Sequence, residues 1–273
     1  MIQILYLLLR PRLALLNGIA AAGGYLLFPG GPSLWPLAGA LAGVTLLAAA
    51  GSAFNQLQER DLDLLMARTR QRPLPNGDLS PTAAAVIGGV CLLAGLLVIS
   101  LAGGLLPTLL GVTALAWYLG LYTPLKRRTP FALAVGGVCG AIPPVIGWCC
   151  AGGTPADFRI MLLACLLYLW QIPHFWLFQR RHAEEYRSAG IPLFEPQLAG
   201  IGNTGICRLW LVALIAGAML LPALGIISRH ASPWYAAVTL GLLIFSLRRS
   251  DTAAFTCLNL FPLLVTLTLI LQR

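Results

Sequence analysis

Apolar segments of membrane-spanning length recur along the whole chain. Polar, glycine-rich or proline-rich interruptions separate nine of them, at residues 12–29, 36–57, 82–102, 105–122, 131–151, 158–179, 204–226, 233–247 and 252–271. About 20 apolar residues in a helix cross the hydrocarbon core of a bilayer. We therefore predict an all-α, polytopic membrane protein with nine transmembrane helices. A count of eight stays open, because 233–247 is short and only Gly103 and Gly104 divide the third segment from the fourth.

The composition supports a single membrane domain over residues 1–273. Hydrophobic residues make up 58% of the chain, against about 45–50% in soluble domains, so the surplus is expected to face lipid. The start, MIQILYLLLR, lacks a basic leading region and a following small-residue cleavage site, so no removable signal peptide is expected. The seven cysteines lie within predicted spans without CxxC spacing, which indicates neither a disulfide framework nor a zinc site.

Charge lies on one side of the predicted topology. With the N-terminus in the cytoplasm, 15 of the 18 Lys and Arg residues and eight of the nine acidic residues fall in cytoplasmic segments. This asymmetry is what the positive-inside rule predicts, so the working face is expected to be cytoplasmic. Two long loops on that side, 58–81 and 180–203, hold most of the ionisable residues. Long loops in compact proteins are usually functional, and we expect these two to form a structured cap over a cavity.

A ladder of oxygen-bearing side chains marks the end of the second span. Asn55, Glu59 and Asp63 are spaced i, i+4, i+8, which puts them within an arc of roughly 80° on a helix. Mg²⁺ commonly binds through one or two carboxylates plus substrate phosphates, and arginines bind phosphate oxygens. The alternative is a solvated helix end with alternating charges. Pro73 and Pro75 are expected to end this helix.

Three further clusters accompany the ladder. The segment YTPLKRRTP, at 122–130, carries three consecutive cations that suit pyrophosphate or simply anchor a span. Small residues and two prolines at 136–148 suit a broken helix beside a cavity, or tight helix packing. The segment 170–192 places Gln171 and His174 at the inner end of a span. An intramembrane histidine is costly unless it has a role, so His174 is predicted to face a cavity.

Four motifs together resemble a known family. They read NxxxxRDxDxxMxRTxxRPL at 55–74, YTxxKRRTP at 122–130, GAxPPxxGW at 140–148 and WQxPHFW…EYxxAGIP at 170–192. In this order and spacing they are similar to the protoheme IX farnesyltransferases (heme O synthases) of the UbiA superfamily of intramembrane prenyltransferases. The likeness covers residues 55–192, and the remainder matches only as apolar spans.

The resemblance implies a nine-helix bundle around a lipid-open cavity, in the cytoplasmic membrane of a prokaryote. It implies Mg²⁺-dependent transfer of farnesyl from farnesyl pyrophosphate to a vinyl group of heme B, with membrane lipid around the protein and downstream heme-handling proteins as further partners. The catalytic set carried across by position is Asn55, Glu59, Asp63 and Lys126. The metal–pyrophosphate ligands are Asn55, Glu59, Asp63 and Glu185, the cations for pyrophosphate are Arg60, Arg68, Arg72, Lys126 and Arg127, and the acceptor contacts are Gln171 and His174.

The chain departs from the family pattern beside the ladder. Glu59 stands where the family usually has aspartate, and Gln56, Leu57 and Gln58 occupy a segment that usually holds an aromatic residue. Glutamate still supplies a carboxylate, but its extra methylene shifts the ligand. The acceptor is therefore the part of the function that the resemblance fixes least.

Other functions fit part of the pattern. A related enzyme could prenylate a quinone or another aromatic ring, although the PHFW segment favours heme. A transporter would also suit inward charges and broken helices, but it predicts polar residues along the depth of several spans. A structural membrane subunit would not need clustered acidic residues. The net charge of +9 suits a membrane surface, and no nucleic-acid recognition element is found.

Overall fold

Every regular element that the structure describes is a helix. The computed structural model describes residues 1–195, 203–248 and 251–272. The elements in chain order are α1 (Ile2–Leu9), α2 (Pro11–Leu27), α3 (Leu34–Gln58), α4 (Arg60–Leu65), α5 (Pro81–Gly103), α6 (Leu105–Ala116), the π-helix η1 (Trp117–Tyr122), α7 (Thr123–Leu125), α8 (Ala132–Cys150), α9 (Phe158–Arg181), α10 (Ala183–Ser188), α11 (Asn203–Ala223), α12 (Ser232–Arg248) and α13 (Asp251–Leu271).

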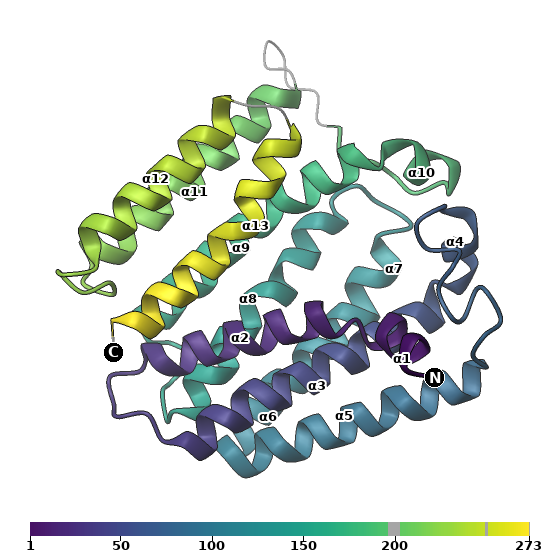
Figure 1. Cartoon of the computed structure of the whole chain (residues 1–273), viewed down its shortest axis with the longest axis horizontal. Coiled ribbons are helices and arrows are strands. Elements are labelled where there is room, and N and C mark those ends of the chain that lie inside the picture. The colour runs from purple at the N-terminus through teal and green to yellow at the C-terminus, as the bar shows by residue number, and fades with distance from the viewer. Residues whose placement is uncertain (196–202, 249–250, 273) are drawn as a thin grey trace.

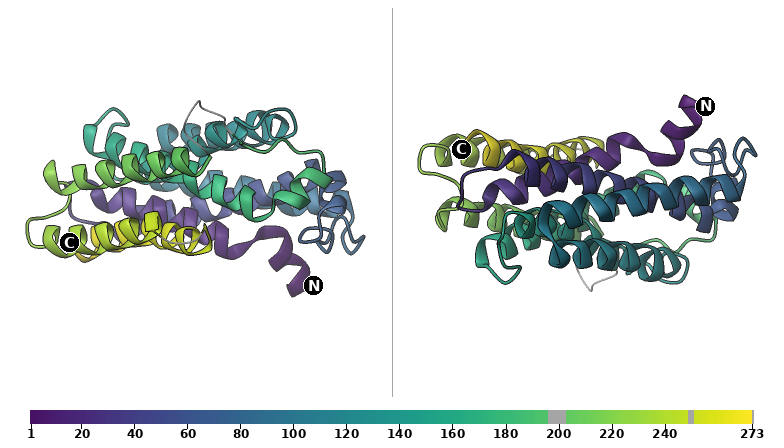
Figure 2. Two further views of the ribbon diagram at one scale, coloured as in Figure 1. Left: turned by 90° about the horizontal axis from the view of Figure 1, so that it is seen from above. Right: turned by 90° about the horizontal axis from the view of Figure 1, so that it is seen from below.

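The long helices form one layered bundle. Their axes run roughly along the long axis of the molecule (Figures 1 and 2). Helix α3 packs against α5 and α2, α2 packs against α8, and α8 packs against α9. Helix α13 contacts both α9 and α2, and α11 and α12 lie outside it. The short elements α4, α7 and α10 and the N-terminus all lie at the right-hand end in Figure 1, which we call the inner end.

The helices that could cross a membrane are fewer than the sequence indicates. In the described part of the chain, seven helices are long and apolar enough, or eight if α1 and α2, bent by 49°, form one span. The predicted count of nine is therefore slightly too high by this standard. The eighth predicted span, at 233–247, corresponds to α12, which has 17 residues. At 1.5 Å per residue such a helix is about 25 Å long, short of a hydrocarbon core of about 30 Å.

The outer faces of the bundle suit lipid. Helix α5 exposes a stripe of large apolar side chains, Val86, Val90, Leu93, Leu97 and Leu101. Its opposite face approaches α3 closely, because Gly39 and Gly43 of α3 leave no Cβ between the backbones. An added Cβ at Gly43 would lie 2.5 Å from a side-chain carbon of Ile99. This is the small-xxx-small packing of membrane helices.

Helix α8 contains the segment 136–148, for which the sequence allows either a broken helix or tight helix packing. It runs from Ala132 to Cys150 without a break, although Pro143 and Pro144 lie inside it. An added Cβ at Gly147 would overlap the carbonyl of Ala21, and one at Gly24 would overlap that of Pro144. The glycines and prolines of this segment thus serve tight packing of α8 on α2 rather than a broken helix.

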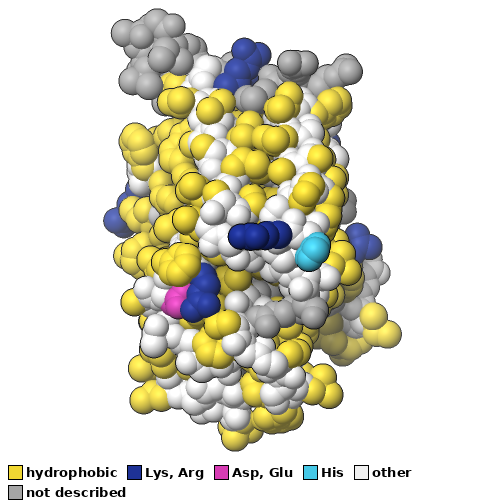
Figure 3. Space-filling model, turned by 90° about the vertical axis from the view of Figure 1, so that its left-hand side faces the viewer, with side chains coloured by type: hydrophobic (Ala, Val, Ile, Leu, Met, Phe, Trp, Pro, Cys, Tyr) yellow, Lys and Arg dark blue, Asp and Glu magenta, His cyan; other side chains and the backbone are white. Residues whose placement is uncertain are grey.

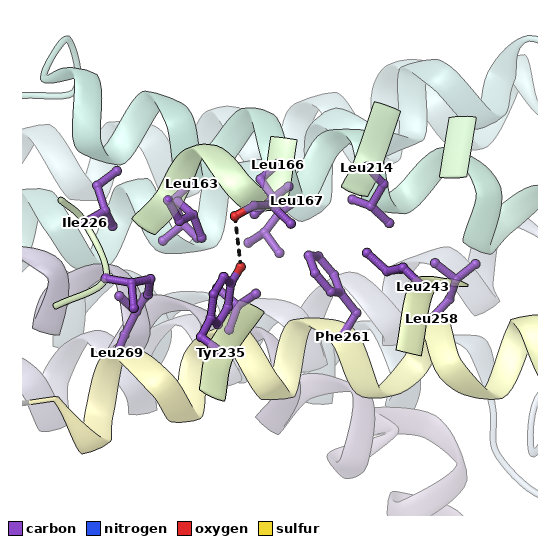
Figure 4. Close-up of a cluster of buried hydrophobic side chains, with 14 of the residues drawn as sticks. Leu163, Leu166, Leu167, Leu214, Ile226, Tyr235, Leu243, Leu258, Phe261 and Leu269 are labelled. Carbon is purple, nitrogen blue, oxygen red and sulfur yellow. Dashed lines mark hydrogen bonds between the residues drawn. The ribbon is translucent and has the colours of Figure 1, made fainter. Parts of the chain in front are cut away.

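The second half of the bundle holds the largest apolar core. Leu163, Leu166 and Leu167 of α9 face Leu214 of α11, Leu243 of α12, and Leu258, Phe261 and Leu269 of α13 (Figure 4). Tyr235 of α12 is buried there and its hydroxyl donates to the carbonyl of Ala218 at 3.3 Å. The end of the molecule opposite the inner end is largely apolar, with few charged side chains (Figure 3).

The helix that leaves the second span ends earlier than expected. The prolines at 73 and 75 predict a helix that continues up to them, but α3 ends at Gln58 and α4 ends at Leu65. Thr69 explains the second end. Its Oγ1 donates to the carbonyls of Asp63 at 3.0 Å and Met66 at 3.4 Å, and the first of these bonds replaces the next helical turn.

The two long inner loops pack on each other. Leu62 and Met66 from the first loop form one apolar cluster with Tyr186, Ala189 and Ile191 from the second. The loops contain the short helices α4 and α10. Residues 196–202, at the end of the second predicted cap loop, lie outside the described residues.

Candidate active site at the inner end of the bundle

The ladder keeps its helical spacing across the break between α3 and α4. The backbone N–H of Glu59 donates to the carbonyl of Asn55 at 2.9 Å, and that of Asp63 donates to Glu59 at 2.8 Å. The three side chains therefore share one face, as the sequence predicts. They are buried, with exposed fractions of 7% for Asn55, 2% for Glu59 and 1% for Asp63. This overturns the alternative of a solvated helix end.

Lys126 neutralises Glu59. Its Nζ donates to Oε1 and Oε2 of Glu59, both at 2.9 Å, from a position 67 residues away along the chain. Lys126 directly follows α7, so the basic segment at 122–130 is brought to the ladder. A buried carboxylate needs such a partner, because leaving a charge unpaired away from water costs several kcal/mol.

Arg72 neutralises Asp63 in the same manner. One terminal nitrogen of Arg72 donates to both carboxylate oxygens of Asp63, at 2.9 and 2.7 Å. Burial raises the pKa of the Asp63 carboxyl above its usual value, Arg72 opposes this shift, and the negative charge of Glu59 adds to it. The interaction with Glu59 shows that the two carboxylates belong to one electrostatic site.

Asn55 is tied to the fourth span rather than to a cation. Its Nδ2 donates to Oγ1 of Thr123 at 3.3 Å, and that hydroxyl donates to the carbonyl of Tyr118 at 2.9 Å. The carbonyl oxygen of the Asn55 amide is therefore left available to a cation. Thr123 was not singled out by the sequence, since a threonine before a proline carries no signal of such a contact.

Glu185 reaches the site through Arg68. Nε of Arg68 lies 3.4 Å from Oε2 of Glu185, an ion pair without hydrogen-bond geometry. The guanidinium of Arg68 also lies over the rings of Phe178 and Tyr186, at 5.3 and 5.8 Å from their centroids. Within the described residues, no three His, Cys, Asp or Glu side chains are placed to share one metal ion. Glu185 thus faces the site's arginine and not the ladder carboxylates.

Arg127 and Arg60 lie at the rim of the site. Arg127 donates to both oxygens of Asp61, at 2.7 and 2.8 Å, and to the carbonyl of Gln58 at 2.7 Å. These hydrogen bonds hold the pKa of the Asp61 carboxyl below its usual value. Arg60 is exposed. The structure therefore separates Lys126 and Arg72, which are half-buried against the carboxylates, from two cations that face solvent.

Gln171 and His174 lie further along the same end on α9. The imidazole of His174 stacks between the rings of Trp170, at 4.8 Å, and Phe255 of α13, at 5.0 Å. Its Nδ1 is buried and has no hydrogen-bond partner among the described residues. The amide of Gln171 lies against the backbone of α8 where an added Cβ at Gly140 would overlap it. Phe255 lies outside the four motifs, so no sequence signal pointed to it.

An open groove of about 600 Å³ lies beside this site and not in it. It runs between α1 and the first inner loop, and its lining includes Gln3, Gln71, Asn76 and Asp78. None of the ladder residues lines it. The chemistry of the inner end is therefore built on the buried ion pairs, not on the groove.

The fold and the site together define an integral membrane protein with a buried carboxylate and cation cluster at one end of a helical bundle. Residues 17–254 match the UbiA prenyltransferase family, and the chain belongs to that family. It is 59% identical over 267 residues to a protoheme IX farnesyltransferase of Geobacter sulfurreducens, covering 97% of each chain. It is 40% identical over 272 residues to a protoheme IX farnesyltransferase of Oleidesulfovibrio alaskensis, covering 97% of this chain and 95% of that one.

Solved structures share the fold. An apo structure of a UbiA homolog from Aeropyrum pernix K1 superposes with a TM-score of 0.74 at 21% identity, covering 96% of this chain and 98% of that one. A UbiA homolog from Archaeoglobus fulgidus bound to GPP and Mg²⁺ gives a TM-score of 0.65 at 18% identity, covering 98% of both chains. At these identities the likeness establishes the helical architecture.

Proposed function

We propose that the protein transfers a farnesyl group from farnesyl pyrophosphate to a vinyl group of heme B, giving heme O. The observation that carries this proposal is the pairing of Glu59 with Lys126 and of Asp63 with Arg72 at the inner end of an apolar bundle. Its support from relatives is the 59% identity to a protein named protoheme IX farnesyltransferase over nearly the whole chain.

The donor set fits Mg²⁺. Asn55, Glu59 and Asp63 offer hard oxygen atoms on one buried face. Mg²⁺ usually takes one or two carboxylates from a protein and completes its octahedron with water and substrate phosphates. The two carboxylates of the ladder match this preference for few protein ligands. Glu185 would contribute from the second loop through its ion pair with Arg68. When bound, Mg²⁺ supplies Lewis-acid stabilisation of the negative charge on the departing diphosphate.

Cationic side chains of the protein would bind the diphosphate as well. Lys126 and Arg72 hold carboxylates in the structure, and a bound diphosphate offers them phosphate oxygens at the same place. Arg68 adds a third cation near the carboxylates, while Arg60 and Arg127 raise the positive potential at the rim. Fixed cations in a site away from bulk water stabilise developing anionic charge without reorganisation. This is what favours breakage of the allylic C–O bond.

The reaction balances as follows. The C1–O bond of farnesyl pyrophosphate breaks and the electron pair stays on pyrophosphate. The terminal carbon of a heme vinyl group bonds to farnesyl C1, which leaves a cation on the carbon next to the porphyrin. One water adds there and loses a proton, giving the hydroxyl of the hydroxyethylfarnesyl group. The apolar bundle keeps other water from quenching the allylic cation first.

Gln171 and His174 are proposed to contact the acceptor. Trp170, His174 and Phe255 form a stack of aromatic rings, and such a cluster suits contact with a planar macrocycle. The unpartnered Nδ1 of His174 leaves a polar atom for a ligand.

The protein is further proposed to lie in the cytoplasmic membrane of a prokaryote, with its N-terminus and the site on the cytoplasmic side. The loops 58–81 and 180–203 would then cap the site, and downstream heme-handling proteins would take up the product. The bias of Lys and Arg to the inner segments supports this orientation.

Product analysis tests the function. Detergent-purified protein is incubated with Mg²⁺, farnesyl pyrophosphate and heme B, and the porphyrin is analysed by mass spectrometry. We expect a porphyrin that has gained one farnesyl group and one hydroxyl group. The contrary result is unchanged heme, together with prenylation of a quinone precursor or another aromatic acceptor in a parallel incubation. The acceptor would then be that aromatic compound and not heme.

A further inference from the structure

The break between α1 and α2 falls on an arginine. Arg10 has φ 48° and ψ 59°, the left-handed region, and it is the one non-glycine residue with positive φ in the described chain. Its backbone N–H donates to the carbonyl of Tyr6 at 3.1 Å, which closes the end of α1. Glycine is the usual residue at such a cap, because other residues are strained there. Residues in strained backbone conformations often have a function, so we expect the side chain of Arg10 to have one.

A buried clamp fixes this break against α3. Oγ of Ser52 donates to the carbonyl of Leu8 at 2.9 Å, and Nε2 of Gln56 donates to the carbonyls of Leu8 at 2.8 Å and Leu7 at 3.1 Å. These carbonyls belong to the last turn of α1 and would otherwise lack partners. Gln56 is 1% exposed and directly follows Asn55 of the ladder. The clamp therefore locks the position of Arg10 relative to the ladder.

The guanidinium of Arg10 belongs to the same electrostatic site. Its charge lies within electrostatic range of Arg72, Tyr118, Arg68 and Asp63, without a direct contact to any of them. Its side chain is exposed, and among the described residues it forms no ion pair with a carboxylate. Of the three guanidiniums near Asp63, that of Arg72 is paired with Asp63 and that of Arg68 with Glu185, so the guanidinium of Arg10 adds a positive charge that no carboxylate among the described residues balances. Such a surplus of positive charge calls for a further anion.

We propose that Arg10 is a further residue that binds the diphosphate of the prenyl substrate, and that Ser52 and Gln56 position it. The inference rests on the proposed function and adds to it a residue from the first helix pair. Arg10 lies between α1 and α2 and Lys126 follows α7, so the diphosphate would contact cations from two separate segments of the chain. A phosphate from a lipid headgroup has the same chemistry and is the other source of such an anion.

The test is binding of farnesyl pyrophosphate to purified protein with Mg²⁺ and without heme. In Arg10→Gly the backbone strain disappears while the guanidinium is lost. We expect its melting temperature to be unchanged or higher and its affinity for farnesyl pyrophosphate to fall about tenfold or more, as for loss of one charged hydrogen bond. Inorganic pyrophosphate should become a weaker competitor by a similar factor. The matched control is Arg12→Gln, which removes an exposed charge two residues away and should bind as the wild type does.

Two results would overturn the inference. Equal affinity of Arg10→Gly and wild type would remove Arg10 from the diphosphate site. A loss seen only in nanodiscs with anionic phospholipid, and absent in detergent, would assign Arg10 to lipid headgroups instead. Wild-type protein that fails to bind farnesyl pyrophosphate at all would instead contradict the proposed function, so the two failures are distinguishable.

A double-mutant cycle tests the clamp. Gln56→Leu should raise KM for farnesyl pyrophosphate more than it lowers kcat, because it displaces a ligand of the diphosphate and not the reacting carbon. In the Arg10→Gly background the same change should have little further effect on affinity, since its target is gone. Independent, additive losses in affinity would show that Gln56 acts without Arg10 and would remove it as a positioning residue.

Discussion

At the scale of single residues, the inner end is organised by buried charge. Glu59 and Asp63 are each held by one cation, and both cations come from segments outside α3 and α4. The helical spacing of the carboxylates could be predicted, because i and i+4 residues share a face. Their partners could not, because Lys126 lies 67 residues from Glu59 and charge alone does not select one of 18 cations.

The first prediction concerns Asp63. Asp63→Asn keeps the shape of the side chain but removes the charge that metal and Arg72 require. We expect turnover to fall about a hundredfold or more, with expression retained. The control is Asp61→Asn, at an exposed position that pairs outward with Arg127. Steady-state assays of both variants check this, and near-normal activity of Asp63→Asn would remove that residue from the metal site.

A second prediction follows from the raised pKa of the Asp63 carboxyl. Protons compete with Mg²⁺ for it at a higher pH than for an ordinary aspartate, whose pKa is about 3.9. The Mg²⁺ affinity should therefore fall on acidification while ordinary aspartates are still ionised. The folding stability of the metal-free protein changes with pH in the opposite direction. Protonated Asp63 stabilises the folded state at pH values below the pKa of this carboxyl in the unfolded chain, and that stabilisation is lost as the pH rises through its pKa in the folded state. Mg²⁺ titrations of farnesyl pyrophosphate binding across pH measure the first effect, and a flat affinity would contradict it.

At the scale of elements, local side-chain contacts decide where helices stop. The prolines at 73 and 75 mark a limit that α4 never reaches, because Thr69 binds the carbonyls that the next turn would use. Such a contact depends on the folded loop and leaves no periodic signal in the sequence. The small residues of α8, by contrast, indicated close helix packing as one of two alternatives.

Helix α8 carries a third prediction. Gly140 leaves space for the amide of Gln171 on α9. Gly140→Ala should displace that amide at a cost of about 1–3 kcal/mol of overpacking. We expect a higher KM for heme with little change in the binding of farnesyl pyrophosphate. Gly241→Ala in α12 is the control, because an added Cβ there meets nothing within 4 Å.

Separate titrations of the two substrates check the Gly140 prediction. A variant in which heme and farnesyl pyrophosphate weaken together would indicate general loosening of the bundle. A variant that binds both substrates as the wild type does would remove Gln171 from the acceptor site.

At the scale of the whole molecule, hydropathy and charge predicted the architecture well. The apolar segments are helices, and α4, α7 and α10 meet at one end (Figure 1). The number of spans was predicted less well. The short segment 233–247 already left a count of eight open, but hydropathy does not show that α1 and α2 are bent. The bend depends on helix geometry that composition does not encode.

The fourth prediction tests the orientation. Asp78→Cys lies in the first inner loop and Ala156→Cys in the loop between α8 and α9, and both positions are exposed. A membrane-impermeant maleimide should label Asp78→Cys only in inverted vesicles and Ala156→Cys only in right-side-out vesicles. The reverse pattern would place the site on the outer side, and wild-type protein controls for labelling of the native cysteines.

The proposed function requires that the carboxylates of the ladder bind a metal ion and that this ion and the neighbouring cations together bind a diphosphate. A structure of the protein with Mn²⁺ and a non-cleavable thio analogue of farnesyl pyrophosphate tests it directly, because anomalous scattering locates the metal. We expect an anomalous peak between the carboxylates of Glu59 and Asp63, with the diphosphate against Lys126 and Arg72. A peak elsewhere, with both ion pairs intact and no diphosphate beside them, would contradict it.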